Sequence, residues 1–84
     1  MWAMAEALAT VRFVGPMRRP PDVGDETDVP VAGGATVDQV LERLGYRPTE
    51  RRVLRVLRAD LPLRLDDRVA AGDTLTVFLP VGGG

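Results

Sequence analysis

Few residues of this chain can do chemistry, and the C-terminal run Gly82-Gly83-Gly84 stands out among them. The chain has no Cys and no His. It therefore lacks a thiol nucleophile, the commonest general base and the commonest metal ligand. Carboxylates, hydroxyls, arginines and the chain ends remain. The pair Asp66-Asp67 has no further ligand beside it, so we expect a turn there and no metal site.

Length and composition predict one domain over residues 1–84, with residues 1–7 as a loose N-terminal segment. Hydrophobic residues make up 45% of the chain and charged residues 27%, which is typical of a globular protein. The net charge of -1 argues against a nucleic-acid partner. No stretch is long enough to span a bilayer and no basic region begins a signal peptide. We therefore expect no membrane partner and a cytoplasmic location.

One helix is predicted over residues 37–44, because its apolar side chains recur at helical spacing. Thr36 is a favourable N-cap, and Gln39 three residues later completes a capping box. Gly45 suits the position just after a helix, and Pro48 is expected to allow no further helix. The apolar stripe of this helix consists of Val37, Val40, Leu41 and Leu44.

Alternation of apolar and polar residues predicts the strands. The first has Ala9, Val11 and Phe13 on one face. Pro30 cannot donate to a ladder, so its strand is expected at a sheet edge. Residues 71–73 are expected to form a tight turn. The predicted strands are residues 8–15, 27–32, 53–58 and 74–79, with a short strand or turn within residues 61–67.

The order strand, strand, helix, strand, short strand, strand predicts an α+β fold. One main helix must cover one face of a mixed sheet of four to five strands, because its apolar stripe has no other surface to pack against. This arrangement is the β-grasp, or ubiquitin-like, fold. Residues 80–84 leave it as a tail of Pro80, Val81 and three glycines. We expect this tail to be flexible, because glycines have no side chains to dock.

The segment from Ala71 to Gly84 resembles the C-terminus of the ThiS/MoaD family of sulfur carriers. That family shows a Gly-Asp turn, an apolar strand, Pro-Val, one variable residue and a final Gly-Gly. Residues 35–45 resemble the family's helix and residues 11–13 its first strand. Many members have an Asn near the turn after the third strand, whereas this chain has Leu57-Arg58-Ala59-Asp60.

The resemblance implies a carrier that is not an enzyme and binds no cofactor itself. A partner adenylating enzyme would use ATP to activate the carboxylate of Gly84, and sulfur would then form a thiocarboxylate. The residues before it, Gly83, Gly82, Val81 and Pro80, would thread into the partner. Phe78 and Leu79 would dock it. The sulfur acceptor would be a synthase, such as the molybdopterin-synthase large subunit or thiazole synthase. The segment from Phe78 to Val81 and the long connection over residues 17–26 favour molybdopterin, with thiamine next.

Two alternatives remain open at this point. The chain can be a ubiquitin-like modifier joined through Gly84 to lysines of other proteins, or a β-grasp interaction module without tail chemistry. The charged residues form two runs that are either solvated surfaces or a means of electrostatic steering towards a partner. The basic run is Arg47, Arg51, Arg52, Arg55 and Arg58, and the acidic run is Asp22, Asp25, Glu26 and Asp28.

Overall fold

The computed structural model describes residues 7–80, and the predicted site residues from Val81 to Gly84 lie outside this range. The N-terminal segment predicted to be loose also falls almost wholly outside it. In chain order the elements are β1 (Leu8–Val14), β2 (Glu26–Pro30), β3 (Ala35–Thr36), α1 (Val37–Arg43), α2 (Pro48–Val53), β4 (Arg55–Arg58), β5 (Leu61–Leu63), β6 (Arg68–Val69) and β7 (Thr74–Phe78).

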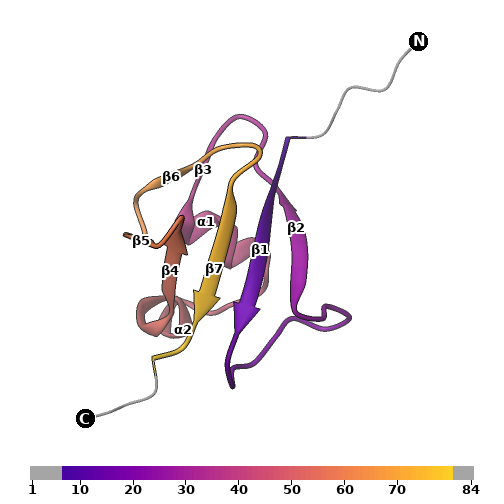
Figure 1. The fold of residues 1–84 in the computed structure, drawn as a ribbon, viewed down its shortest axis with the longest axis vertical. Helices are drawn as coiled ribbons and strands as arrows, with labels where there is room; N and C mark the ends of the chain where they lie inside the picture. The colour runs from indigo at the N-terminus through magenta and orange to yellow at the C-terminus, as the bar shows by residue number, and fades with distance from the viewer. Residues whose placement is uncertain (1–6, 81–84) are drawn as a thin grey trace.

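Five strands form one mixed sheet in the order β2-β1-β7-β4-β5. The pair β1 and β7 is parallel, and the other neighbours are antiparallel. Helix α1 lies behind this sheet and leaves its front face open (Figure 1). The predicted β-grasp fold is therefore confirmed. Strand β2 is at the edge, as Pro30 predicted. A second small sheet of β3 and β6 was not predicted.

The core lies between the sheet and α1, and strand alternation decides which residues enter it. The face predicted for the first strand is the inner one: Ala9, Val11 and Phe13 of β1 are buried. Leu75 and Val77 of β7 are buried as well. Helix α1 adds its predicted stripe, of which Leu44 is only partly buried. The buried helical residues are Val37, Val40 and Leu41.

The capping box at the start of α1 is confirmed. The backbone N–H of Gln39 donates to Thr36 Oγ1 at 3.2 Å, and the backbone N–H of Thr36 donates to Gln39 Oε1 at 2.9 Å. These two N–H groups have no carbonyl acceptor within the helix, and the two side chains accept their hydrogen bonds instead. Gly45 follows with a φ of 95°, a left-handed conformation that suits glycine.

The expectation that Pro48 allows no further helix is wrong, because α2 begins at Pro48. Proline is favourable at the first helical position, where its missing N–H has no helical acceptor. The Glu50 carboxylate also accepts the backbone N–H of Arg47 at 2.9 Å. The strand predicted from Val53 therefore starts two residues later, at Arg55. Val53 ends α2 instead.

A two-residue turn joins β4 to β5, at the position where the sequence lacks the family's Asn. Ala59 has a φ of 51° and Asp60 a φ of 67°. Both are left-handed conformations, which a two-residue hairpin turn of this kind requires at its central positions. Asp tolerates this region better than most residues, whereas Ala has no local hydrogen bond to offset its cost. The short strand Leu61–Leu63 that follows confirms the expectation for this segment.

Candidate functional site

Strand β7 carries the chain directly to the predicted tail. It lies between β1 and β4 in the middle of the sheet (Figure 1). The predicted turn at its start is confirmed: Asp73 donates its backbone N–H to the Ala70 carbonyl at 3.1 Å. The Asp73 carboxylate accepts from the Ala70 N–H at 2.8 Å and from Arg58 at 2.9 Å. These hydrogen bonds hold the start of β7, the end of this central strand that lies opposite to the tail.

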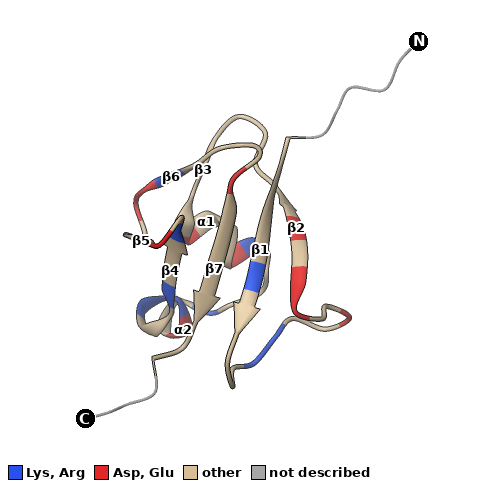
Figure 2. Ribbon diagram, viewed as in Figure 1, with Lys and Arg blue, Asp and Glu red and all other residues tan. Residues whose placement is uncertain are grey.

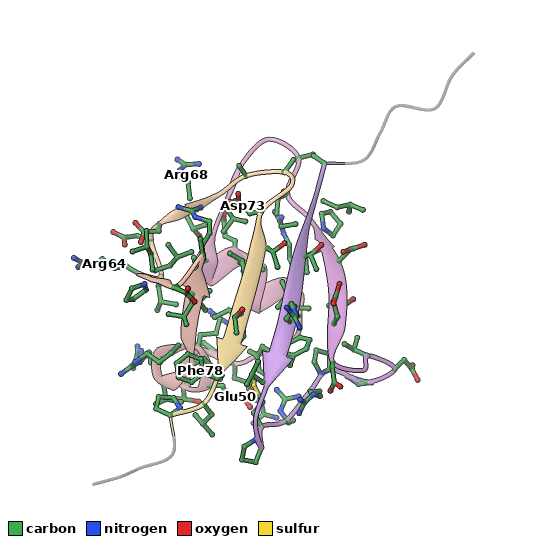
Figure 3. All side chains as sticks on the ribbon, viewed as in Figure 1. Glu50, Arg64, Arg68, Asp73 and Phe78 are labelled. Carbon is green, nitrogen blue, oxygen red and sulfur yellow. The ribbon has the colours of Figure 1, made fainter. Side chains whose placement is uncertain are left out.

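Phe78 lies on the open face of the sheet, at the end where the tail leaves (Figure 3). In register it faces Val14 of β1 on one side and Arg55 of β4 on the other. Val14 is 50% exposed and adds apolar surface beside Phe78. Beside Phe78 a shallow, mainly apolar hollow of about 410 Å³ opens, which Leu57, Pro62 and Pro80 also line.

Leu79 points to the other side of the strand, as the alternation predicts, and packs partly buried against the core. It lines a smaller hollow of about 120 Å³ whose other apolar walls are Met17, Val53 and Leu54. Val53 is 51% exposed, so this hollow reaches the surface. The two residues predicted to dock a partner therefore belong to different hollows, on opposite sides of the base of the tail.

A charged cluster borders the smaller hollow and was not predicted from the sequence. Arg18 donates two hydrogen bonds to the Glu50 carboxylate, one of 2.8 Å from Nη2 and one of 3.0 Å from Nε. The Arg18 guanidinium also lies over the Tyr46 ring, 5.0 Å from its centre. The Tyr46 hydroxyl donates to the Arg18 carbonyl at 2.6 Å. Together these contacts fasten the connection between β1 and β2 to the start of α2.

This geometry changes the acidity of the groups involved. The hydrogen bond from Arg18, followed by that from the Arg47 backbone, lowers the pKa of Glu50 from 4.5 to about 2. The same hydrogen bond raises the pKa of Arg18. Burial raises the pKa of Tyr46. The shifts of Glu50 and Arg18 favour their ion pair at neutral pH, and the raised pKa of Tyr46 keeps its hydroxyl protonated as a hydrogen-bond donor.

Asp66 and Asp67 form a turn, as expected. The Arg64 backbone N–H donates to Asp67 Oδ2 at 2.7 Å, and Asp66 lies 3.8 Å from the Arg64 side chain. Across residues 7–80, no three His, Cys, Asp or Glu residues come together as a metal site would require. Within the same range, no helix is long and apolar enough to cross a membrane.

Comparison with family models identifies the family to which this chain belongs. The model of the ThiS family matches residues 11–84, a range that includes the whole glycine run. This chain belongs to the ThiS family. The crystal structure of SAMP1 from Haloferax volcanii is similar in fold, with a TM-score of 0.66 and 24% sequence identity. The match covers 92% of this chain and 99% of SAMP1. Among curated proteins, the comparison finds no match.

Membership of the ThiS family places this chain among small ubiquitin-like proteins that act as sulfur carriers or modifiers. They are not catalysts themselves, so the ThiS-family protein described here is not an enzyme. Members of the ThiS family generally work with an activating enzyme and with partners that accept sulfur. The structural match to SAMP1 confirms the ubiquitin-like β-grasp fold.

Proposed function

We propose that this ThiS-family protein is a sulfur carrier that is loaded at the carboxylate of Gly84. A partner enzyme adenylates the carboxylate with ATP, and a sulfur nucleophile converts it to a thiocarboxylate. The thiocarboxylate then donates its sulfur in the biosynthesis of a cofactor. The observation that carries this proposal is the family match, which runs through the glycine end of the chain at residue 84.

The proposed chemistry follows from the weakness of a carboxylate as an acyl donor. A carboxylate oxygen attacks the α-phosphorus of ATP, the bond to the β-phosphate breaks, and pyrophosphate leaves. Hydrosulfide then attacks the carbonyl carbon, AMP leaves with its electron pair, and the acid loses its proton to give the thiocarboxylate. A chain without Cys is suited to this role, because the sulfur is bound to the terminal carbonyl carbon.

The glycines of the tail have a physical reason within this proposal. A backbone without Cβ atoms fits a narrow channel and approaches a nucleotide closely. A side chain at Gly83 or Gly84 would displace the carbonyl carbon, and small displacements are costly for transfer chemistry. The rigid base of the tail helps, since β7 lies between two paired strands and its start is held by Asp73. Pro80, Val81 and Gly82 would span the distance between that base and the partner's nucleotide site.

The two hollows at the base of the tail support docking through Phe78 and Leu79. Phe78 and Pro80 line the larger hollow on the open face of the sheet. Leu79 lines the smaller one, which has room for about one apolar side chain of a partner. Exposed apolar surface beside a reactive terminus is typical of a protein interface. We therefore expect the adenylating enzyme to cover both hollows when it binds the tail.

Among sulfur pathways, we favour molybdopterin and place thiamine second. The support is the sequence of residues 78–81 and the long connection between β1 and β2, which spans residues 15–25. The loaded carrier should then transfer sulfur to the molybdopterin precursor when the molybdopterin-synthase large subunit is present. Transfer only with thiazole synthase would assign the chain to thiamine biosynthesis instead.

Intact-mass spectrometry tests the proposal. The protein is incubated with its adenylating enzyme, ATP and hydrosulfide, and its mass is compared with that of a variant lacking Gly84. A gain equal to one oxygen replaced by one sulfur, absent from the variant, is the expected result. Conjugates between this chain and lysines of other proteins, without any sulfur gain, would instead favour a protein modifier. Absence of both products would favour an interaction module without tail chemistry.

A further inference from the structure

The structure divides the basic run of residues 47–58 into two groups. Arg51 and Arg58 make internal ion pairs, at 2.7 Å to Asp38 and 2.9 Å to Asp73. The Arg51 side chain is only 11% exposed. The second group is exposed and has no ion pair with any residue in the described range 7–80. This group consists of Arg47, Arg52 and Arg55, which we call the arginine patch.

Within residues 7–80, the acids beside the arginine patch pair with other arginines. Asp38 and Asp66 line a hollow together with Arg52, but Asp38 pairs with Arg51 at 2.7 Å and Asp66 with Arg64 at 3.8 Å. Glu50, the one acid within residues 47–55, is engaged by Arg18. Residues 47–55 hold four arginines and one glutamate, a formal charge of +3, in a chain whose net charge is -1. Residues 22–28 hold four acids and no base, a formal charge of -4. Figure 2 shows the blue of α2 near the end of β7 and the red of β2 on the far edge of the sheet.

One member of the arginine patch borders the base of the tail. Arg55 faces Phe78 in register and lines the larger hollow together with Pro80. Four residues follow Pro80 in the sequence, and an extended chain of that length spans at most about 14 Å. Any protein that holds the carboxylate of Gly84 therefore lies within about that distance of Pro80. Such a partner must come close to Arg55, and it reaches Arg47 and Arg52 if its surface continues along α2.

We propose that the arginine patch is a docking surface for a cluster of carboxylates beside the tail channel of the adenylating enzyme. The inference rests on the proposed function, since it describes the surface of the adenylating enzyme that binds the tail. Separated charges of opposite sign also orient the carrier during approach. The arginine patch turns towards an acidic surface, while the acidic run of residues 22–28 is repelled from it. Arginine suits this role, because its planar fork binds a carboxylate through two hydrogen bonds.

Association kinetics test this inference. Stopped-flow measurements give the association rate of the carrier with its adenylating enzyme, at ionic strengths from about 0.01 M, where charges act over long distances, to about 1 M, where they are screened. The test variant combines Arg47→Glu, Arg52→Glu and Arg55→Glu. The control variant combines Arg64→Glu and Arg68→Glu, two exposed arginines that lie apart from Phe78, Arg68 towards the other end of the sheet and Arg64 to one side (Figure 3).

We expect the wild-type rate to fall as salt rises, and the test variant to associate about tenfold or more slowly at low salt. The control variant should stay within about threefold of wild type, because its substitutions lie away from the tail. A milder variant with all three arginines of the patch changed to Gln should fall in between. Circular dichroism of each variant checks its fold, and the Gln variant keeps the test valid if the Glu variant does not fold.

The intact mass of each variant after loading separates the two claims. If wild-type protein gains no sulfur with an adenylating enzyme active on another carrier, the proposed function fails. If wild-type protein is loaded and the arginine-patch variants associate at wild-type rates at every salt concentration, the inference fails while the proposed function stands. An equal slowing in the control variant would also overturn it, because net charge alone would then explain the effect.

Discussion

Arg18 and Glu50 lie 32 residues apart in the sequence and form a two-pronged ion pair with N–O distances of 2.8 and 3.0 Å. The pair joins the long connection after β1 to helix α2. It closes one side of the hollow that Leu79 lines next to the tail. The wall of this hollow therefore depends in part on a contact between two residues that no local sequence pattern brings together.

The first prediction concerns the pH dependence of this pair. The pKa of Glu50 is lowered from 4.5 to about 2 in the folded protein. A lowered pKa means that the pair stabilises the fold fully above pH 4.5 and that this contribution is lost as the pH falls towards 2. Glu50→Gln should therefore lower the melting temperature at pH 7, and the difference from wild type should vanish near pH 2.

Thermal unfolding followed by circular dichroism between pH 7 and pH 2 measures this difference. Glu42→Gln serves as the control, because Glu42 is exposed and has no ion pair within the described part of the chain. A difference between Glu50→Gln and wild type that stays constant over this pH range would contradict the assigned role of the carboxylate.

The second prediction compares two leucines in different environments. Leu75 of β7 is 1% exposed in the centre of the core, whereas Leu61 of β5 is 67% exposed. Leu75→Ala should lower the free energy of unfolding by about 2–5 kcal/mol, because it leaves a cavity between the sheet and α1. Leu61→Ala should change it by no more than about 0.5 kcal/mol. Urea denaturation measures both, and similar losses for the two variants would show that the core is placed incorrectly.

The third prediction concerns the turn between β4 and β5. Ala59 has a φ of 51°, a conformation that Asn adopts more easily than Ala. Ala59→Asn should therefore raise the free energy of unfolding by about 0.5–1 kcal/mol. Ala59→Val should lower it, since a branched side chain is strained at positive φ. Urea denaturation of the two variants should show shifts in opposite directions, and a gain in stability from Val would refute the turn geometry.

The fourth prediction separates docking from folding at the open face of the sheet. Phe78→Ser should reduce kcat/KM for adenylation of the carrier about tenfold or more, which corresponds to about 1.4 kcal/mol of lost interaction with the enzyme. Thr74→Ala, on the same strand and face but at the end far from the tail, should leave kcat/KM nearly unchanged. Equal effects of the two substitutions, or none from Phe78→Ser, would exclude Phe78 from the interface.

Local signals in the sequence were sufficient for much of the fold. Thr36 and Gln39 form the predicted capping box, and Pro30 lies on an edge strand. Helix α2 was missed because a proline can stop a helix as well as begin one, and because α2 buries none of its own residues. Without an apolar stripe, no periodicity reveals such a helix. The pairing of β3 with β6 was missed as well, since two-residue strands carry no alternation to read.

Only the part of the candidate site that is contiguous in the sequence was predictable. Residues 78–84 are contiguous, so the resemblance to a family identifies them together. Arg18, Tyr46 and Glu50 meet through the tertiary fold, and nothing in their separate segments indicates that they surround Leu79. The arginine patch was visible as a run of basic residues. Only the structure shows that Arg51 and Arg58 are engaged internally, while Arg55 remains exposed beside Phe78.

The most direct test of the central claim is to locate sulfur on the C-terminal peptide after loading with the adenylating enzyme, ATP and hydrosulfide. Fragmentation of that peptide by tandem mass spectrometry identifies the residue that carries the added mass. We predict that the entire gain lies on Gly84 and that Gly83→Val greatly slows its formation. Sulfur found on any other residue, or an undiminished gain in protein that lacks Gly84, would contradict the account.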